Sequence, residues 1–314
     1  MKKPLPTLVY TDRCFEDHNT GPGHPENAGR LQAVRRILPA GTNTPPVPGP
    51  ESFPRADGVH STAQIQLVRQ LTKQGGGSID PDTVVSPASW DVARRAAATC
   101  TDAVERILDG QARNALCLIR PPGHHATDQQ SMGFCLFNNI ALAAQTVLQR
   151  QAGPCLIVDW DVHHGNGTQD IFYNRDDVFY YSVHRYPFYP GTGHSSETGT
   201  GPGLGYTLNV PLPAATSSRE YVDAFRAGLE KAAARIKPGF LLISAGFDAH
   251  RLDPVGSLGL GSEDFYLLTR MVIEVADLYC GGRLVSCLEG GYEPAALARS
   301  VGAHLRALED QTPG

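Results

Sequence analysis

The sequence lacks three features that would each place it in a different class of protein. No stretch of its 314 residues approaches the apolar length that crosses a bilayer, so we expect no contact with a membrane. The seven cysteines form no CxxC pair, and we expect neither a disulfide framework nor a cysteine zinc site. The formal net charge of -5 offers no basic surface for phosphate backbones, so no nucleic acid partner is expected.

The chain also lacks a linker, an internal repeat and a low-complexity segment. No run rich in Pro, Ser or Gly and no block of like charge divides it, which predicts a single domain over residues 1–314. Two lysines follow Met1, but the apolar segment of a signal peptide does not, so we expect a cytoplasmic protein. The pattern leaves the oligomeric state open.

Short apolar runs alternate with segments of helical periodicity along the chain. Strands are expected at residues 7–10, 115–119, 155–158, 178–183, 240–243 and 284–288. Helices are expected at residues 26–38, 62–73, 90–109, 138–151, 218–236, 262–279 and 294–308. Ser262 is the expected N-cap of the helix that Gly281 and Gly282 end. The alternation predicts an α/β fold in which helices cover both faces of a parallel sheet.

Polar residues directly follow five of the predicted strands, and the densest group is DWDVHHG at residues 159–165. Because the carboxyl ends of parallel strands meet at one edge of a sheet, we expect these groups to converge. Asp161 and His163 are two residues apart, so in an extended chain they project to the same side, as two ligands of one metal must. The side chains expected at this edge are His124, His125, Asp161, His163, Asp248 and Tyr292.

Taken singly, each of these segments is also typical of an ordinary structural feature. A DxH sequence occurs in polar turns, adjacent histidines occur in solvated loops, and a GGY sequence is often a turn with a packed tyrosine. Together, however, the segments supply metal ligands, bases and a hydroxyl donor, which metal-assisted hydrolysis requires. Two carboxylates and one imidazole leave coordination positions open, which is typical of a catalytic zinc site.

Six motifs occur in order along the chain: RPPGHHA at 120–126, MGFCLFNN at 132–139, VDWDVHHGNGTQ at 158–169, YPGTG at 189–193, SAGFDAH at 244–250 and LEGGY at 288–292. In these motifs the chain resembles the zinc-dependent histone deacetylase superfamily, most closely its class II-like bacterial branch. That branch contains the histone deacetylase-like amidohydrolases and acetylpolyamine amidohydrolases. The resemblance implies an arginase-like three-layer α/β/α fold with a central, mainly parallel, eight-stranded sheet.

The resemblance also implies roles for the matching residues. The zinc (Zn2+) ligands would be Asp161, His163 and Asp248. His125 would act as general base toward the attacking water and then as general acid toward the leaving amine. His124 would be its electrostatic partner, so the proton transfers of the reaction would be carried by His125.

Further residues would support the catalytic groups. Asp159 would fix the tautomer and charge of His124, and Asn166 would stand behind His125. Because an amide carries no charge, Asn166 should leave His125 neutral at pH 7 more readily than a carboxylate would. Tyr292 would donate its hydroxyl to the amide oxygen as negative charge develops there.

The same resemblance implies a narrow channel for an acylated aliphatic chain. Phe134 and Tyr189 would form its aromatic walls, and the backbone carbonyl of Gly133 would accept from the substrate amide. Val255 would lie at the entrance, where a neutral side chain cannot attract a second ammonium group. A neutral entrance favours acyl-lysine or other small acylated amines over long polyamines.

A potassium (K+) ion beside the zinc site is implied as well. Its ligands would be Asp159, the main chain of Asp161 and His163, Ser182 and the carbonyl of Val183. For Ser182, a hydrogen bond to backbone inside a buried strand is an equally good interpretation. A second, weaker cation site would lie near Phe172, Arg175, Val178 and Tyr206.

The resulting hypothesis is an enzyme that hydrolyses acyl-lysine peptides or small acylated amines. An acetylpolyamine deacetylase is the nearest alternative. A dinuclear manganese ureohydrolase would need further bridging carboxylates, and a non-catalytic acyl-lysine-binding module would not need His125 or Tyr292. One departure from the family pattern is Asn27-Ala28-Gly29, where relatives more often have a proline and an acid, and this segment is expected to fold differently.

Overall fold

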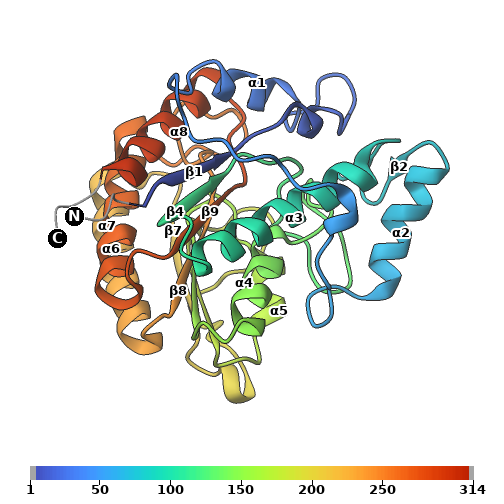
Figure 1. The fold of residues 1–314 in the computed structure, drawn as a ribbon. Helices are drawn as coiled ribbons and strands as arrows, with labels where there is room; N and C mark the ends of the chain where they lie inside the picture. Colours follow the sequence, from blue (N-terminus) through green and yellow to red (C-terminus); the bar gives the residue numbers. More distant parts are fainter. Residues whose placement is uncertain (1–4, 311–314) are drawn as a thin grey trace.

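The computed structural model describes residues 5–310 and has a seven-stranded sheet at its centre (Figure 1). The strands are β1 (Thr7–Tyr10), β4 (Asn114–Cys117), β5 (Cys155–Asp159), β6 (Val178–Arg185), β7 (Thr207–Leu212), β8 (Phe240–Ala245) and β9 (Leu284–Leu288). Their order is β1-β4-β9-β8-β5-β6-β7, and all neighbours in the sheet are parallel. The predicted α/β class is confirmed.

The sheet has seven strands where the resemblance implied eight. The remaining two strands of the described chain, β2 (Gly77–Ser78) and β3 (Val84–Val85), pair only with each other and are antiparallel. Each contains two residues and is joined to the other by a turn that contains Asp80, Pro81 and Asp82, so neither is long enough to extend the main sheet.

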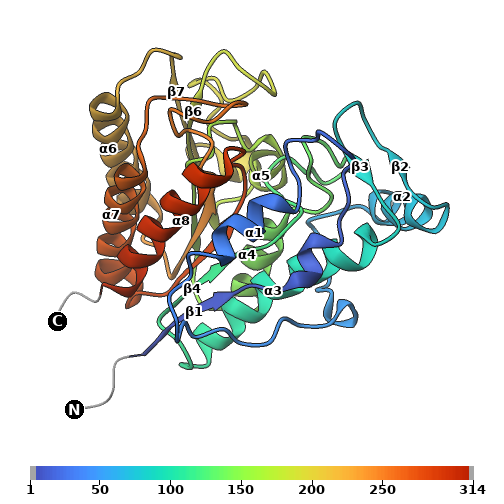
Figure 2. The same cartoon turned by 90° about the horizontal axis from the view of Figure 1, so that it is seen from above.

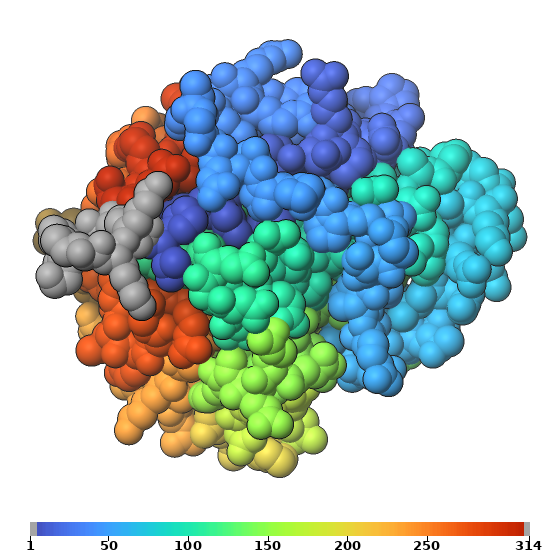
Figure 3. All heavy atoms as spheres, in the orientation of Figure 1, coloured from blue at the N-terminus to red at the C-terminus, as the bar shows by residue number. Residues whose placement is uncertain are grey.

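Helices cover both faces of the sheet (Figure 2). The helices α3 (Ser89–Leu108) and α4 (Asn139–Gln149) pack on one face, and α6 (Ser218–Ile236), α7 (Ser262–Cys280) and α8 (Pro294–Glu309) pack on the other. The remaining helical segments are α1 (Gly29–Arg35), α2 (Thr62–Lys73), α5 (Asn166–Phe172), η1 (Arg13–Glu16), η2 (Pro50–Ser52) and η3 (Gly201–Gly203). The segment that contains η2 runs across α3 on the face seen in Figure 3.

The central strands explain why apolar runs revealed the sheet. Every residue of β4, β5, β8 and β9 is buried, as expected for parallel strands covered on both faces. The strand β7 was not predicted. It lies at the edge of the sheet, only two of its six residues are buried and it contains Pro211, so it has no continuous apolar run.

Most helix ends lie within two residues of the prediction, but the first helix and the N-cap of α7 differ from it. The first helix begins at Gly29 rather than residue 26, because the Asn27 side chain accepts from the Gly29 N–H at 2.9 Å and forms a turn before α1. The N-cap of α7 is Gly261, not Ser262, and its N–H donates to Asp264 at 2.7 Å. Gly281 ends α7 as predicted, with a φ of 64°.

Three cysteines that lie far apart in the sequence meet in the core. The sulfur atoms of Cys100, Cys117 and Cys287 lie within 4.8 Å of one another, where α3 packs on the paired strands β4 and β9. Nothing in their spacing along the chain predicted this cluster. Within residues 5–310, no helix is both long enough and apolar enough to cross a bilayer.

Candidate functional site

The polar segments that follow β4, β5, β8 and β9 meet at the carboxyl edge of the sheet. The strands β9, β8 and β5 are neighbours in the sheet, so the loops that follow them approach one another. The six side chains expected at this edge lie together there, and all but the half-buried Tyr292 are at most 7% exposed: His124, His125, Asp161, His163, Asp248 and Tyr292.

Asp161, His163 and Asp248 each direct one potential ligand atom into a common region, and these atoms lie within 4.8 Å of one another. Asp161 Oδ1 and Asp248 Oδ2 lie 3.0 and 3.2 Å from His163 Nδ1. The opposite carboxylate oxygens are anchored to backbone. Gly290 N–H donates to Asp161 Oδ2 at 2.8 Å, and Val162 N–H donates to Asp248 Oδ1 at 2.9 Å. The loops therefore hold both carboxylates in a fixed orientation.

The potential ligand atoms of Asp161, His163 and Asp248 fit a divalent cation. Asp248 Oδ2 is buried and accepts no hydrogen bond from any described residue. Burial and the charge of Asp161 raise the pKa of Asp248 to about 7, and a cation bound between the two carboxylates would favour their ionised forms. Carboxylate oxygen and imidazole nitrogen are the ligands of many catalytic zinc sites.

His124 and His125 lie side by side, with ring centroids 4.0 Å apart, but their electrostatic surroundings differ. Burial lowers the pKa of His124, yet the charges of Asp159, 3.0 Å away, and Asp161 outweigh burial and raise the pKa to about 10. Burial and the neighbouring His124 lower the pKa of His125 well below its ordinary value. At neutral pH one histidine is thus a cation and the other is neutral.

The hydrogen bond behind His125 sets its tautomer. His125 Nδ1–H donates to Asn166 Oδ1 at 2.8 Å, because an amide oxygen only accepts. The other ring nitrogen, Nε2, then keeps a lone pair. A neutral imidazole with a free Nε2 can take up a proton.

Glu289 belongs to the LEGGY motif, but no role was predicted for it from the sequence. Its Oε2 accepts from the N–H groups of Gly123 and His124, at 2.6 and 3.2 Å, and its Oε1 accepts from Ser244 at 3.0 Å. The side chain therefore ties the His124 loop to β8 and β9. A glutamate placed directly after a buried strand was the signal that could have identified it.

The site opens into a pocket of about 170 Å³. The four residues predicted to form the substrate channel all line it, and Asp82 and Phe188 line it without having been predicted. The full lining is Asp82, His125, Gly133, Phe134, His163, Phe188, Tyr189, Val255 and Tyr292.

Aromatic rings and one glycine make the pocket narrow. The ring of Phe188 stacks on His163, with centroids 5.1 Å apart, and Tyr189 meets His125 edge-on at 5.1 Å. Gly133 has a φ of 56°, and a Cβ at this position would lie 2.5 Å from the ring of His125. Only glycine allows the backbone to pass this close to His125.

A buried ion cluster supports Tyr292 from behind. Arg30 Nε donates to Gly291 O at 2.6 Å, and the guanidinium of Arg30 lies 4.9 Å from the centre of the Tyr292 ring. Glu26 pairs with Arg30 at 2.9 Å and with Arg120 at 2.7 Å. These charged residues are at most 1% exposed. No role was predicted for them from the sequence, although the i,i+4 spacing of Glu26 and Arg30 is typical of an ion pair.

Substitution of Glu26 is expected to destabilise the protein strongly. Burial raises the pKa of Glu26, but Arg120 and Arg30 outweigh burial and lower the pKa to about 2. Glu26→Gln leaves two buried guanidinium groups without an anion and should lower the free energy of unfolding by about 3–5 kcal/mol in urea denaturation. The exposed Glu274→Gln is the control, for which a change within about 0.5 kcal/mol is expected.

The same ion cluster predicts how stability depends on pH. Because the pKa of Glu26 falls from 4.5 to about 2 in the folded protein, its contribution is complete above about pH 4.5 and is lost as the pH falls toward 2. Glu26→Gln should not show this part of the acid dependence. An identical loss of stability in both proteins over this pH range would contradict the assignment.

The residues expected around potassium lie near the ends of β5 and β6. Asp159 and Ser182 are partners in the sheet register. Ser182 Oγ forms a hydrogen bond with His184 Nδ1 at 2.8 Å, and the Val183 carbonyl accepts from Tyr221 at 3.3 Å. Both groups thus have protein partners, and potassium at this position stays a prediction.

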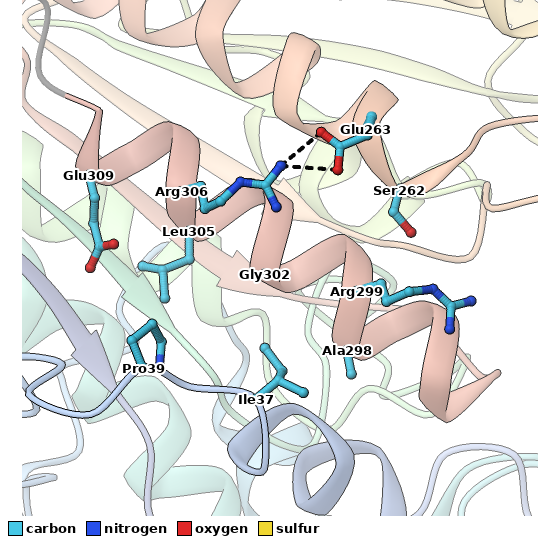
Figure 4. A pocket seen from close by; sticks show the side chains of 10 residues that line it. All are labelled: Ile37, Pro39, Ser262, Glu263, Ala298, Arg299, Gly302, Leu305, Arg306 and Glu309. Atoms are coloured by element: carbon cyan, nitrogen blue, oxygen red, sulfur yellow. Dashed lines mark hydrogen bonds and ion pairs between the residues drawn. The ribbon is translucent and has the colours of Figure 1, made fainter.

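A larger pocket of about 440 Å³ lies along α8 and shares no residue with the candidate site (Figure 4). Its lining includes Ile37 and Leu305, and the ion pair between Arg306 and Glu263, 2.8 Å apart, lies at its rim. None of the residues predicted to carry chemistry faces this pocket.

Comparison with known proteins gives a consistent result. The family model described as Histone deacetylase domain matches residues 24–308. The probable deacetylase of Archaeoglobus fulgidus is 42% identical over 234 residues, which cover 74% of this chain and 65% of that protein. The histone deacetylase-like amidohydrolase of Pseudomonas aeruginosa is 40% identical over 239 residues, which cover 76% of this chain and 63% of that protein. The chain thus spans slightly less than two thirds of each relative's length.

A solved structure agrees over nearly the whole chain. The crystal structure of the HDA15 HD domain matches with a TM-score of 0.90 and 34% sequence identity. The match covers 97% of this chain and 91% of that chain.

Proposed function

This chain belongs to the histone deacetylase family, and from that premise we propose that it is a zinc-dependent amidohydrolase that removes acetyl or related acyl groups. Its substrates would be acyl-lysine side chains or small acylated amines. The observation that carries the proposal is the meeting of Asp161, His163 and Asp248 beside a neutral His125, at the base of a narrow aromatic pocket.

Asp161, His163 and Asp248 would hold the zinc ion. When bound, zinc supplies Lewis acidity, which polarises the substrate carbonyl and lowers the pKa of water. Among residues 5–310, the only other group of three residues able to share an ion is the buried cysteine cluster. This arrangement supports one catalytic metal and disfavours the dinuclear manganese ureohydrolase alternative.

The proton transfers are assigned to His125. Its Nε2 would accept a proton from the attacking water and later deliver a proton to the nitrogen of the leaving amine. The hydrogen bond from Nδ1 to Asn166 would hold the ring in the required orientation. His124, kept cationic by Asp159, would stabilise negative charge that develops beside it.

The remaining site residues would bind and orient the acyl chain. The Tyr292 hydroxyl would donate to the oxyanion, and the Gly133 carbonyl would accept from the substrate amide N–H. Phe134 and Tyr189 would enclose the aliphatic chain, with Phe188 added to the aromatic wall. Their presence supports an enzyme over a non-catalytic binding module.

Metal removal is the direct test of this proposal. The purified protein is expected to contain one zinc per chain and to lose turnover of an acetyl-lysine peptide after chelation, with recovery when zinc is restored. Loss of Asp248 in the Asp248→Ala variant should lower zinc content by itself. Full activity in metal-free protein, or two manganese ions per chain, would exclude the proposed chemistry.

Two residues at the pocket bear on substrate choice. Val255 is neutral and favours acyl-lysine, whereas the Asp82 carboxylate also lines the pocket and could attract a second ammonium group. This acid keeps the acetylpolyamine deacetylase as the second candidate. We expect kcat/KM to be higher for an acetyl-lysine peptide than for acetylputrescine, and a preference for acetylputrescine would reverse the order of the two candidates.

We also propose that residues 1–314 form one deacetylase domain in the cytoplasm, with potassium at the ends of β5 and β6 as a structural ion. Its ligands would be Asp159, the main chain of Asp161 and His163, Ser182 and the Val183 carbonyl, since potassium prefers hard oxygen donors.

A further inference from the structure

The loop between β6 and η3 carries two pocket aromatics but is rich in glycine and largely exposed. Phe188 and Tyr189 lie in this loop and contact the rings of His163 and His125. Gly191 and Gly193 have φ values of 92° and 90°, so the backbone that follows the two aromatics has little conformational preference of its own. Contacts from outside this segment must therefore hold the aromatic wall in place.

Glu197 supplies the main anchor of the loop. Its Oε1 accepts from the N–H groups of Gly193 and His194, at 3.0 and 2.9 Å. Its Oε2 accepts from Gln169 Nε2 at 2.6 Å. Because Gln169 lies on α5, the carboxylate joins a tight turn of the loop to a helix that packs against the sheet.

Beyond Gln169, the hydrogen bonds lead back to the candidate site. Gln169 Oε1 lies 3.0 Å from His164 Nε2 and accepts from Asn209 Nδ2 at 2.7 Å. The other ring nitrogen of His164, Nδ1, lies 2.7 Å from Thr192 Oγ1, in the same loop as the aromatics. His164, Gln169 and Asn209 are all at most 4% exposed, so the hydrogen bonds that join these three side chains are protected from water.

The Glu197 carboxylate determines which atom donates in each hydrogen bond of this network. A carboxylate only accepts, so Gln169 must turn its NH2 group toward Glu197 and its oxygen toward His164. His164 then donates from Nε2, and its Nδ1 accepts from the Thr192 hydroxyl. If the Gln169 amide were reversed, its NH2 group would face the N–H of His164 and the NH2 of Asn209, and donors would meet donors.

We propose that Glu197 is a positioning residue that holds Phe188 and Tyr189 against the two imidazoles and so determines the affinity of the pocket for the acyl chain. The inference rests on the proposed function, because the aromatic wall matters only if an acyl chain binds there. Glu197 does not line the pocket, and its effect would be exerted through the loop.

Glu197→Gln is the first test, with the acetyl-lysine peptide as substrate and zinc-loaded protein. The side-chain amide introduced by this substitution has one oxygen and one NH2 group. It therefore cannot accept hydrogen bonds from both Gln169 and the backbone N–H groups of Gly193 and His194. KM is expected to rise about tenfold, corresponding to the loss of about 1.4 kcal/mol, while kcat changes less than about threefold. The exposed Glu230→Gln is the matched control, and both constants should be unchanged.

A double exchange distinguishes positioning from a general structural role. In Gln169→Glu combined with Glu197→Gln, the carboxylate now on α5 accepts from His164 and Asn209. The amide now in the loop donates to that carboxylate, while its oxygen accepts from the loop N–H groups. Net charge is unchanged and every donor again meets an acceptor. The tenfold rise in KM expected for the single variant corresponds to about one lost hydrogen bond. Because the double variant restores that bond, its KM should return to within about threefold of the wild-type value.

Hydrogen exchange measured by mass spectrometry provides a readout that does not depend on activity. Amide exchange over residues 186–194 should be faster in Glu197→Gln and slow again in the double variant, with the remaining peptides unchanged. Unchanged exchange in the single variant, no recovery in the double variant, or a loss of kcat without a rise in KM would overturn the inference. A wild-type protein without turnover would refute the proposed function, and the exchange data would still decide whether Glu197 holds the loop.

Discussion

Replacement of His125 by alanine is expected to lower kcat for an acetyl-lysine peptide by about 10²- to 10⁴-fold, the range in which general acid–base catalysis contributes. The expectation rests on two observations. Burial and the cationic His124 keep His125 neutral, and the Asn166 carbonyl oxygen binds Nδ1–H and leaves Nε2 free. Steady-state kinetics with zinc-loaded protein measure the effect.

Two measurements show whether the loss comes from proton transfer. The zinc content of His125→Ala should equal that of the wild type, because the ligand set does not include this residue. The exposed Gln66→Ala on α2 is a control for loss of a polar side chain, and its kcat should change less than about twofold. Retention of more than a tenth of wild-type kcat in His125→Ala would remove His125 from the assigned role.

Tyr292→Phe is expected to lower kcat by about 100- to 1000-fold, the usual effect of removing one donor to an oxyanion. Burial and the nearby Asp248 raise the pKa of the Tyr292 hydroxyl well above its ordinary value, so the group carries its proton at neutral pH. The ring lies under the guanidinium of Arg30 and edge-on to Phe134. Phenylalanine preserves these contacts, and KM should change little.

The control for this substitution is Tyr266→Phe on α7, which removes a hydroxyl that donates only to the exposed Asp310. Its kinetics should match those of the wild type. A tenfold or larger rise in KM for Tyr292→Phe with unchanged kcat would indicate that the hydroxyl binds the ground state rather than the oxyanion.

The paired histidines illustrate how one sheet edge creates different chemical groups from identical residues. His124 and His125 are adjacent in the sequence, but a buried carboxylate faces one and an amide faces the other. Burial lowers the pKa of His124, but the charges of Asp159 and Asp161 outweigh burial and raise it, whereas burial and the cationic His124 lower the pKa of His125. Sequence motifs identified the pair, and the partners explain the difference between them.

Much of the fold could be predicted because the central strands are buried on both faces. Such strands must be continuously apolar, so β5 and β8 are recognisable as runs of residues. The edge strand β7 and the short α5 carry no such pattern and were missed. The number of strands in the sheet depends on which segments pair, and local sequence does not specify pairing.

The sequence by itself determined the α/β class, the family, and the set of polar residues that follow the strands, because parallel strands present their carboxyl ends at one edge. Only the tertiary structure decided which side chains support that set. Glu289, Phe188 and the cluster around Glu26 act through contacts between segments that are distant in the chain. The family resemblance assigned different roles to the two aspartates of DWDVHHG, but only the fold shows Asp159 beside His124 and Asp161 beside Asp248, because charge and burial are properties of the assembled site.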